Sequence, residues 1–299
     1  MAPILTNLSS FLGFRSIPRG RRSATGGNIV ISDNYAYHIF TGTGTFRPTT
    51  AFPFSVECLI IGGGGSSNPG GNSGGGGAGG YRSVTSTAVF NTSYPISVGG
   101  GGPTTAPRSG TASSAFGFTS AGGGGGGLAK ASGGAGGSGG GGGGLNTPAP
   151  PFGGASGPGN NPPTSPPQGN PGGPAGGYST APGTGGGGGS ITNTGSPGGP
   201  GPGATSTYPS PGDGTGAPGG HPASATFPVP IIGQGIPSPL YPTWFPAVDP
   251  EGFCRGGNAG PRTTPTRSPI ANTGYGGDWS QPTGASSGIV VIRYLITVQ

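Results

Sequence analysis

The side chains that could do chemistry are few, and their spacing forms no metal-binding pattern. The 299-residue chain contains two histidines, His38 and His221, and two cysteines, Cys58 and Cys254. A structural zinc site is usually built from closely spaced pairs of such residues, which are missing here. We therefore expect no metal and no cofactor, and interpret His38 as a surface or strand histidine. The two cysteines are expected to be free thiols, with a disulfide as the alternative.

Two serines, Ser73 and Ser138, match the G-x-S-x-G pattern of hydrolase nucleophiles. That pattern works only at a sharp strand-to-helix turn, and in a chain with 76 glycines such matches arise by chance. Glycoside hydrolysis would instead need two carboxyl groups roughly 5–10 Å apart. Among the six acidic residues, only Asp249 and Glu251 are near neighbours in sequence. We predict that the protein is not an enzyme.

Glycine and proline dominate the composition, with 76 and 37 residues. Hydrophobic residues make up 29% and charged residues 6%, against about 45–50% and 25% in typical soluble domains. Disorder is the default expectation for such a chain. However, pure glycine tracts occur at 122–127, 139–144 and 185–189. Glycine can form extended polyproline-II-type helices that bond laterally to one another, so we expect a polyglycine-II/PPII bundle.

Strand-like segments alternate with these tracts, at 28–61, 81–98, 111–121 and 289–298. In the first and last of these, apolar residues recur with the period of two that is typical of half-buried strands. We therefore expect a mostly irregular fold with β structure and essentially no α-helix, in which short strands clamp the bundle. The expected clamp residues are Val56, Cys58, Ile60, Val290, Ile292 and Tyr294. Glu57 and Arg293 are expected to pair across the two strands.

The net charge of +6 is concentrated near the beginning of the chain, where Arg15, Arg19, Arg21 and Arg22 occur within 22 residues. We interpret residues 1–25 as a basic docking arm and 26–299 as a glycine-rich domain. A solvated tail and an organellar transit peptide are the alternatives. The arginines are not spread along the chain as in a nucleic-acid-binding surface. No apolar run approaches the length of a membrane span, so membrane insertion is not expected.

Residues 145–255 are rich in proline and are expected to form loops, because proline removes backbone donors and excludes helices and interior strands. An aromatic cluster, Tyr241, Trp244 and Phe245, falls in this region. It is expected either to form a small satellite core or to provide anchors for a partner.

Several glycine-rich motifs are spaced along the chain. They are CLIIGGGG at 58–65, GGYRS at 79–83, SVGGGG at 97–102, SAFGFTSAGGGGGG at 114–127, ANTGYGG at 271–277 and SSGIVVIRY at 286–294. Together they resemble the glycine-rich domain common in virion and tail-fibre-like proteins of marine phages, especially those that infect cyanobacteria. The resemblance covers roughly residues 35–295. A more distant resemblance is to the polyglycine-II adhesins at the long-tail-fibre tips of T-even-like phages.

The resemblance implies a non-enzymatic virion protein, a tail fibre or fibre tip for host recognition, anchored by its N-terminal arm. Its partners would be other virion proteins and a host surface glycan or outer-membrane protein, and it could form a trimer. The alternatives are a capsid decoration or capsid fibre protein, and a glycine-rich matrix or ice-binding protein. The expected receptor-contact residues are Tyr208, His221, Tyr241, Trp244 and Phe245.

Overall fold

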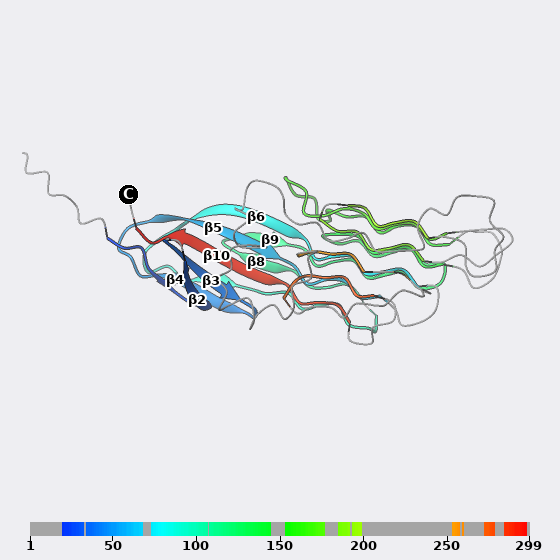
Figure 1. The fold of residues 1–299 in the computed structure, drawn as a ribbon, viewed down its shortest axis with the longest axis horizontal. Coiled ribbons are helices and arrows are strands. Elements are labelled where there is room, and N and C mark those ends of the chain that lie inside the picture. The colour runs from blue at the N-terminus through cyan, green and yellow to red at the C-terminus, as the bar shows by residue number, and fades with distance from the viewer. Residues whose placement is uncertain are drawn as a thin grey trace, which may run out of the picture.

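Strands gather at one end of an elongated molecule, and glycine-rich segments run lengthwise from them toward the other end (Figure 1). The computed structural model describes residues 20–32, 34–67, 73–106, 108–144, 153–176, 185–191, 193–198, 253–257, 259, 272–278 and 284–297. Within these residues there is no helix, and every strand pairing is antiparallel. The predicted absence of helix and the predicted β structure are therefore confirmed for this part of the chain.

In the described part of the chain, ten strands form three sheets. The largest has the order β2-β3-β10-β5-β6, a second has the order β1-β4-β7, and β8 and β9 form a hairpin. The chain therefore places its last strand, β10, at the centre of the largest sheet. The strands are β1 (Ala24–Thr25), β2 (Asn28–Ser32), β3 (Tyr35–Phe40), β4 (Gly44–Pro48), β5 (Phe54–Ile61), β6 (Tyr81–Ala88), β7 (Tyr94–Ile96), β8 (Ser113–Ala115), β9 (Phe118–Ser120) and β10 (Ile289–Leu295).

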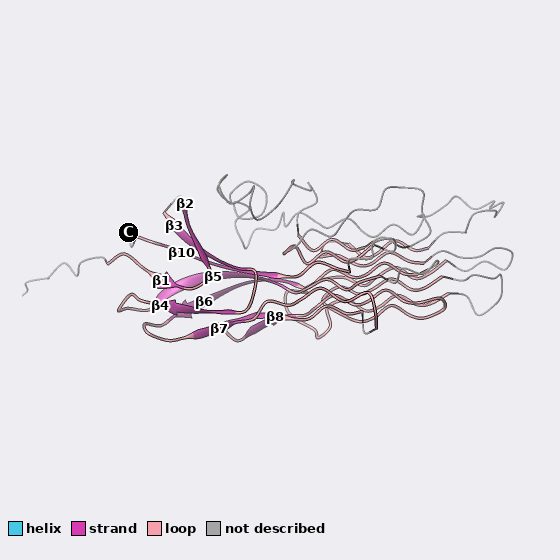
Figure 2. Cartoon of the chain, turned by 90° about the horizontal axis from the view of Figure 1, so that it is seen from below, coloured by secondary structure: helices cyan, strands magenta, loops and turns pink. Residues whose placement is uncertain are grey.

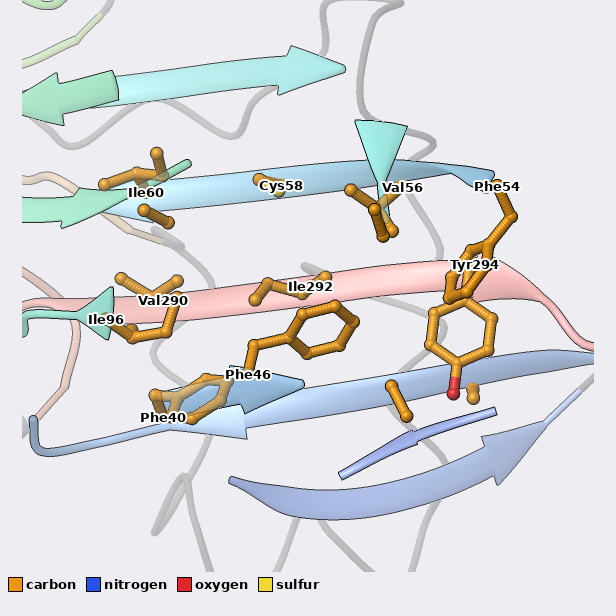
Figure 3. Packing of buried hydrophobic residues seen from close by; sticks show 14 of the residues in the cluster. Phe40, Phe46, Phe54, Val56, Cys58, Ile60, Ile96, Val290, Ile292 and Tyr294 are labelled. Atoms are coloured by element: carbon orange, nitrogen blue, oxygen red, sulfur yellow. The ribbon is translucent and has the colours of Figure 1, made fainter. Parts of the chain in front are cut away.

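The main apolar cluster lies between the five-stranded sheet and the smaller sheets, which supply residues such as Phe46 from β4 and Ile96 from β7 (Figure 3). Phe46 is completely buried, and its ring centroid lies 5.7 Å from that of Phe116 and 6.4 Å from that of Tyr294. The opposite face of the large sheet forms a second cluster, to which Leu59 and Val291 belong. Both faces of β5 and β10 are thus buried over much of their length, and the prediction of half-buried strands understates their burial.

Glycine-rich segments continue directly from the strands. Residues 62–67 follow β5, 73–80 lead into β6, 121–127 follow β9, and 284–288 lead into β10. Figure 2 shows these segments lying side by side along the long axis of the molecule. They are joined by backbone hydrogen bonds between segments that are far apart in the sequence, such as Gly64 N–H to Ser286 O at 2.9 Å.

The lateral hydrogen bonds repeat every third residue. In residues 138–143, three successive N–H groups donate to three different neighbouring segments. The fourth N–H donates to the same segment as the first, and the order then repeats. The same repeat holds in residues 74–79. For 138–143 the donor and acceptor pairs are Ser138 to Ala78, Gly139 to Asn170, Gly140 to Gly134, Gly141 to Gly75, Gly142 to Gly173, and Gly143 to Ala131, with N···O distances of 2.8–3.1 Å.

Glycine is required in these segments because their backbones approach one another closely. A Cβ added at Gly64 would lie 1.9 Å from the carbonyl oxygen of Tyr275, and one added at Gly124 would lie 2.0 Å from that of Gly134. Cβ atoms in real proteins essentially never come within 3.0 Å of such an atom. The absence of a side chain is therefore a packing requirement in this part of the molecule.

The glycine-rich segments that these lateral hydrogen bonds join are called the glycine array. The array also includes segments that we expected to be loops. Residues 153–158 and 170–176 lie within the predicted Pro-rich loop region 145–255, yet Gly154 donates to Gly143 O and Gly173 donates to Gly187 O. Proline is tolerated because, at some backbone positions of the array, no N–H group is needed to donate a hydrogen bond to a neighbouring segment. The glycines between the prolines supply the N–H groups instead.

Candidate interaction surfaces and buried polar sites

The six predicted clamp residues lie on β5 and β10, which pair directly. Ile292 is opposite Cys58, and Val290 is opposite Ile60. The side chains point to the same face of the sheet and belong to one apolar cluster (Figure 3). None of the six is more than 3% exposed. The structure therefore places them where a strand pair joins an early part of the chain to its last strand.

The expected ion pair between Glu57 and Arg293 is present on the opposite face of the same strands. Arg293 donates from Nη2 to Glu57 Oε2 at 2.7 Å and from Nε to the same oxygen at 3.0 Å. Its guanidinium carbon also lies 4.6 Å from the centroid of the Tyr35 ring. The Arg293 side chain is 2% exposed, so this contact neutralises a charge that the sheet buries.

His38 is a buried strand residue, and the alternative of a surface histidine is wrong. It lies in β3, and its Nδ1 is 2.7 Å from the carbonyl oxygen of Gly26. Because a carbonyl only accepts hydrogen bonds, Nδ1 carries the proton, and Nε2 accepts one from the Tyr294 hydroxyl at 3.2 Å. Desolvation lowers the pKa of His38 despite the Gly26 contact, and burial raises the pKa of Tyr294 to about 12. The neutral imidazole thus links residues before β2 to β10.

Both cysteines are free and buried, which confirms the prediction of free thiols. Burial raises the pKa of Cys58 to about 12 and also raises the pKa of Cys254. The reactive thiolate form is therefore disfavoured at neutral pH. Among the described residues, no group of three or more His, Cys, Asp or Glu side chains comes together to hold a metal ion.

The two serines of the G-x-S-x-G matches lie inside the glycine array. Ser73 is 1% exposed and Ser138 is fully buried. The Ser138 backbone donates to Ala78 O and accepts from the Gly124 N–H, so it is an ordinary member of the lateral network. In the part of the chain that the structure describes, neither serine lies at a strand-to-helix turn, the position that the nucleophile pattern requires.

The last residues of the predicted N-terminal arm are attached to the β end of the molecule. Arg22 donates from its backbone N–H to Ile296 O at 2.8 Å and from Nη1 to Leu295 O at 3.3 Å. β1 then pairs with β4, whereas the Arg21 side chain is exposed. Arg15 and Arg19 lie outside the described residues. The predicted arm is therefore bonded to the fold at Arg22, beside the end of β10.

The predicted receptor-contact residues, Tyr208, His221, Tyr241, Trp244 and Phe245, all lie outside the described residues. Their role stays a prediction.

A buried glutamine was missed by the sequence reasoning. Gln168 is fully buried; its Oε1 accepts from the Ala121 N–H at 2.8 Å, and its Nε2 donates to Pro162 O at 2.7 Å. The backbone carbonyl of Gln168 also accepts from the Tyr81 N–H at 2.9 Å. Gln168 thus satisfies a backbone group where β6 begins through its own backbone, and one where the segment after β9 starts through its side chain. Nothing in the local sequence distinguishes Gln168 from a loop residue.

An exposed apolar strand was also missed. Ile29 and Ile31 on β2 are 45% and 64% exposed, although the sequence NIVIS was recognised only as a strand. The other large apolar residues that are exposed in the described part of the chain are Val89, Phe90, Leu128 and Leu295.

The chain finds no match among family models or curated proteins. In its described part, the protein has no helix that is long and apolar enough to cross a membrane.

Proposed function

We propose that the protein is a non-enzymatic structural protein of a bacteriophage virion, a tail fibre or fibre tip for host recognition, whose glycine-rich part is a polyglycine-II bundle. The observation that carries this proposal is the repeat of lateral hydrogen bonds at every third residue in 74–79 and 138–143.

The three-residue repeat supports the bundle because a polyproline-II-type helix has three residues per turn. Successive N–H groups then point about 120° apart, so each meets a different neighbour and every third meets the same one. The close approach of Cα atoms to neighbouring carbonyl oxygens, as at Gly64, adds weak Cα–H···O contacts. None of the glycines in 122–127 or 139–143 has a positive φ, in keeping with one continuous extended helix.

Such a bundle suits a virion fibre because it is stiff and exposes its loops at a distance from its attachment point. The glycine-rich segments extend away from the sheets along the molecule, whereas the strands gather at the opposite end (Figure 1). The predicted receptor-contact residues fall between Gly198, which donates to Pro174 O, and Phe253, which belongs to the second apolar cluster of the large sheet. The basic arm, whose residue Arg22 is bonded beside the end of β10, would contact other virion proteins.

Labelled electron microscopy of virions tests the proposal. A gold-labelled antibody against the purified full chain should bind to fibres or fibre tips, and the purified chain should compete with virions for adsorption to host cells. Label over the whole capsid would favour the capsid decoration alternative. Absence of the protein from purified virions would overturn the proposal. Release of saccharides from host envelopes by the purified chain would overturn the proposal that it is not an enzyme.

Variants of the predicted contact residues test host recognition separately. Trp244→Ala with Phe245→Ala should weaken adsorption competition at least tenfold, because aromatic anchors supply much of the binding energy in recognition surfaces. Leu128→Ala, an exposed apolar residue in the array, is the matched control and should compete as the natural chain does.

A further inference from the structure

We propose that β2 is a pairing edge for a second copy of this chain, and that two copies associate by joining their β2 strands antiparallel. β2 is the terminal strand of the five-stranded sheet, and among the described residues it pairs only with β3 on its inner side. No described backbone outside β3 bonds to residues 28–32. The outer edge of β2 therefore presents backbone groups that are unpaired within the described chain, and such groups are a template for another strand.

The side chains of β2 favour pairing and do not prevent it. Ile29 and Ile31 lie two residues apart and therefore on one face of the strand, where they are 45% and 64% exposed. Asn28–Ser32 contains no charge and no proline, the features by which edge strands usually avoid association. An exposed apolar edge of this kind costs free energy in water, and association would remove that cost.

The other edge of the same sheet is protected. Arg82 on β6 donates to Thr119 O at 3.0 Å, and its guanidinium carbon lies 5.5 Å from the centroid of the Phe118 ring. The β8-β9 hairpin thus packs beside β6, whose side chains are mostly small and polar. Within the described chain, the contrast singles out β2 as the edge built to accept a strand.

The spacing of β2 makes it complementary to itself. In an antiparallel pair centred on Val30, Ile29 of one copy lies opposite Ile31 of the other, and Ile31 opposite Ile29. All four isoleucines then share one face, as cross-strand apolar pairs do. A twofold axis through Val30 brings the same surface of each copy together, the usual geometry of homodimers. The uncharged strand offers nothing to attract a charged partner, so a second copy fits it best.

Sedimentation velocity of the purified full chain tests this proposal, because a five-residue pairing predicts a reversible, concentration-dependent dimer. The variant Ile29→Lys with Ile31→Lys should weaken dimerisation at least tenfold, since it places like charges on facing strands. Val89→Lys with Phe90→Lys adds the same charges at another exposed apolar pair and should dimerise as the natural chain does. A monomer at all concentrations, or an oligomer that both variants leave intact, would overturn the proposal.

Cross-linking tests the register and does not depend on the lysine variants. In the proposed pair, residue 28 of one copy is opposite residue 32 of the other, so Asn28→Cys with Ser32→Cys should form a disulfide-linked dimer on oxidation. Cys58 and Cys254 are buried and should not contribute. Val89→Cys is the matched exposed control. Equal cross-linking of the two variants, or none in the double variant, would contradict the pairing.

Discussion

At the scale of single residues, the packing of the glycine array depends on what lies in the direction in which each glycine would carry a side chain. Gly101 and Gly100 are adjacent and make this distinction clearly. A Cβ at Gly101 would lie 1.9 Å from Ala285 O, whereas one at Gly100 would meet only the Thr111 hydroxyl at 3.9 Å. Neighbouring glycines in one segment therefore differ in whether they tolerate any side chain.

Gly101→Ala should lower the free energy of unfolding by about 1–3 kcal/mol, because the segment must move away from residue 285. Gly100→Ala should leave stability unchanged or raise it by about 0.4–1 kcal/mol, since it restricts only the unfolded chain. Chemical denaturation of the two variants measures both. Equal destabilisation by the two substitutions would show that the close approach does not matter.

His38 should make stability depend on pH. Burial holds the folded-state pKa of His38 below the usual value of 6.5. Below pH 6.5 the unfolded chain therefore binds a proton at His38 that the folded chain does not bind. The contribution of neutral His38 to the free energy of unfolding is therefore fully present above pH 6.5. It decreases as the pH is lowered below 6.5, until the pH is below the lowered folded-state pKa. Thermal unfolding between pH 7.5 and 5 measures the effect.

The matched controls for this effect are His38→Gln and His221→Gln. His38→Gln should flatten the dependence of the melting temperature on pH in this range. His221→Gln replaces the other histidine of the chain and should leave that dependence unchanged. A steep dependence that persists in His38→Gln would show that another group is responsible.

At the scale of elements, the pair β5 and β10 holds the strand end together. Ile292→Ala should cost about 2–5 kcal/mol, because the residue is fully buried at the centre of the sheet and its removal leaves a cavity. Leu295→Ala, on the same strand but 39% exposed, should cost no more than about 0.5 kcal/mol. Chemical denaturation compares the two, and similar losses would contradict a core centred on β10.

The strands were predictable because their signal is local. The alternation in residues 54–61 predicts β5 and its faces. The pairing of Glu57 with Arg293 was also expected, but it depends on the register between two strands that are distant in sequence, which this alternation does not determine. The place of residues 153–176 was not predictable, because their hydrogen bonds go to segments that are distant in sequence. Nor does a five-residue strand such as β2 indicate that it will lie at an edge, which left Ile29 and Ile31 unrecognised.

At the scale of the whole molecule, the hydrogen-bond network joins every part of the described chain to distant parts. Gly76 donates to Gly277 O and Gly75 to Gly186 O, so removing one segment leaves backbone groups unsatisfied in several others. Glycine offers little apolar surface to compensate, so the segments depend on one another and on the sheets. The array and the strands should therefore unfold together.

Hydrogen exchange followed by mass spectrometry tests this cooperativity. Peptides covering 122–127 and 138–143 should exchange only by global opening, with the same free energy as peptides from β5, because their amides are held by several segments. Gly101→Ala should speed exchange in the glycine segments and in β5 by the same factor. Glycine segments that exchange a hundredfold faster than β5, or that alone respond to Gly101→Ala, would show that the array opens independently of the sheets.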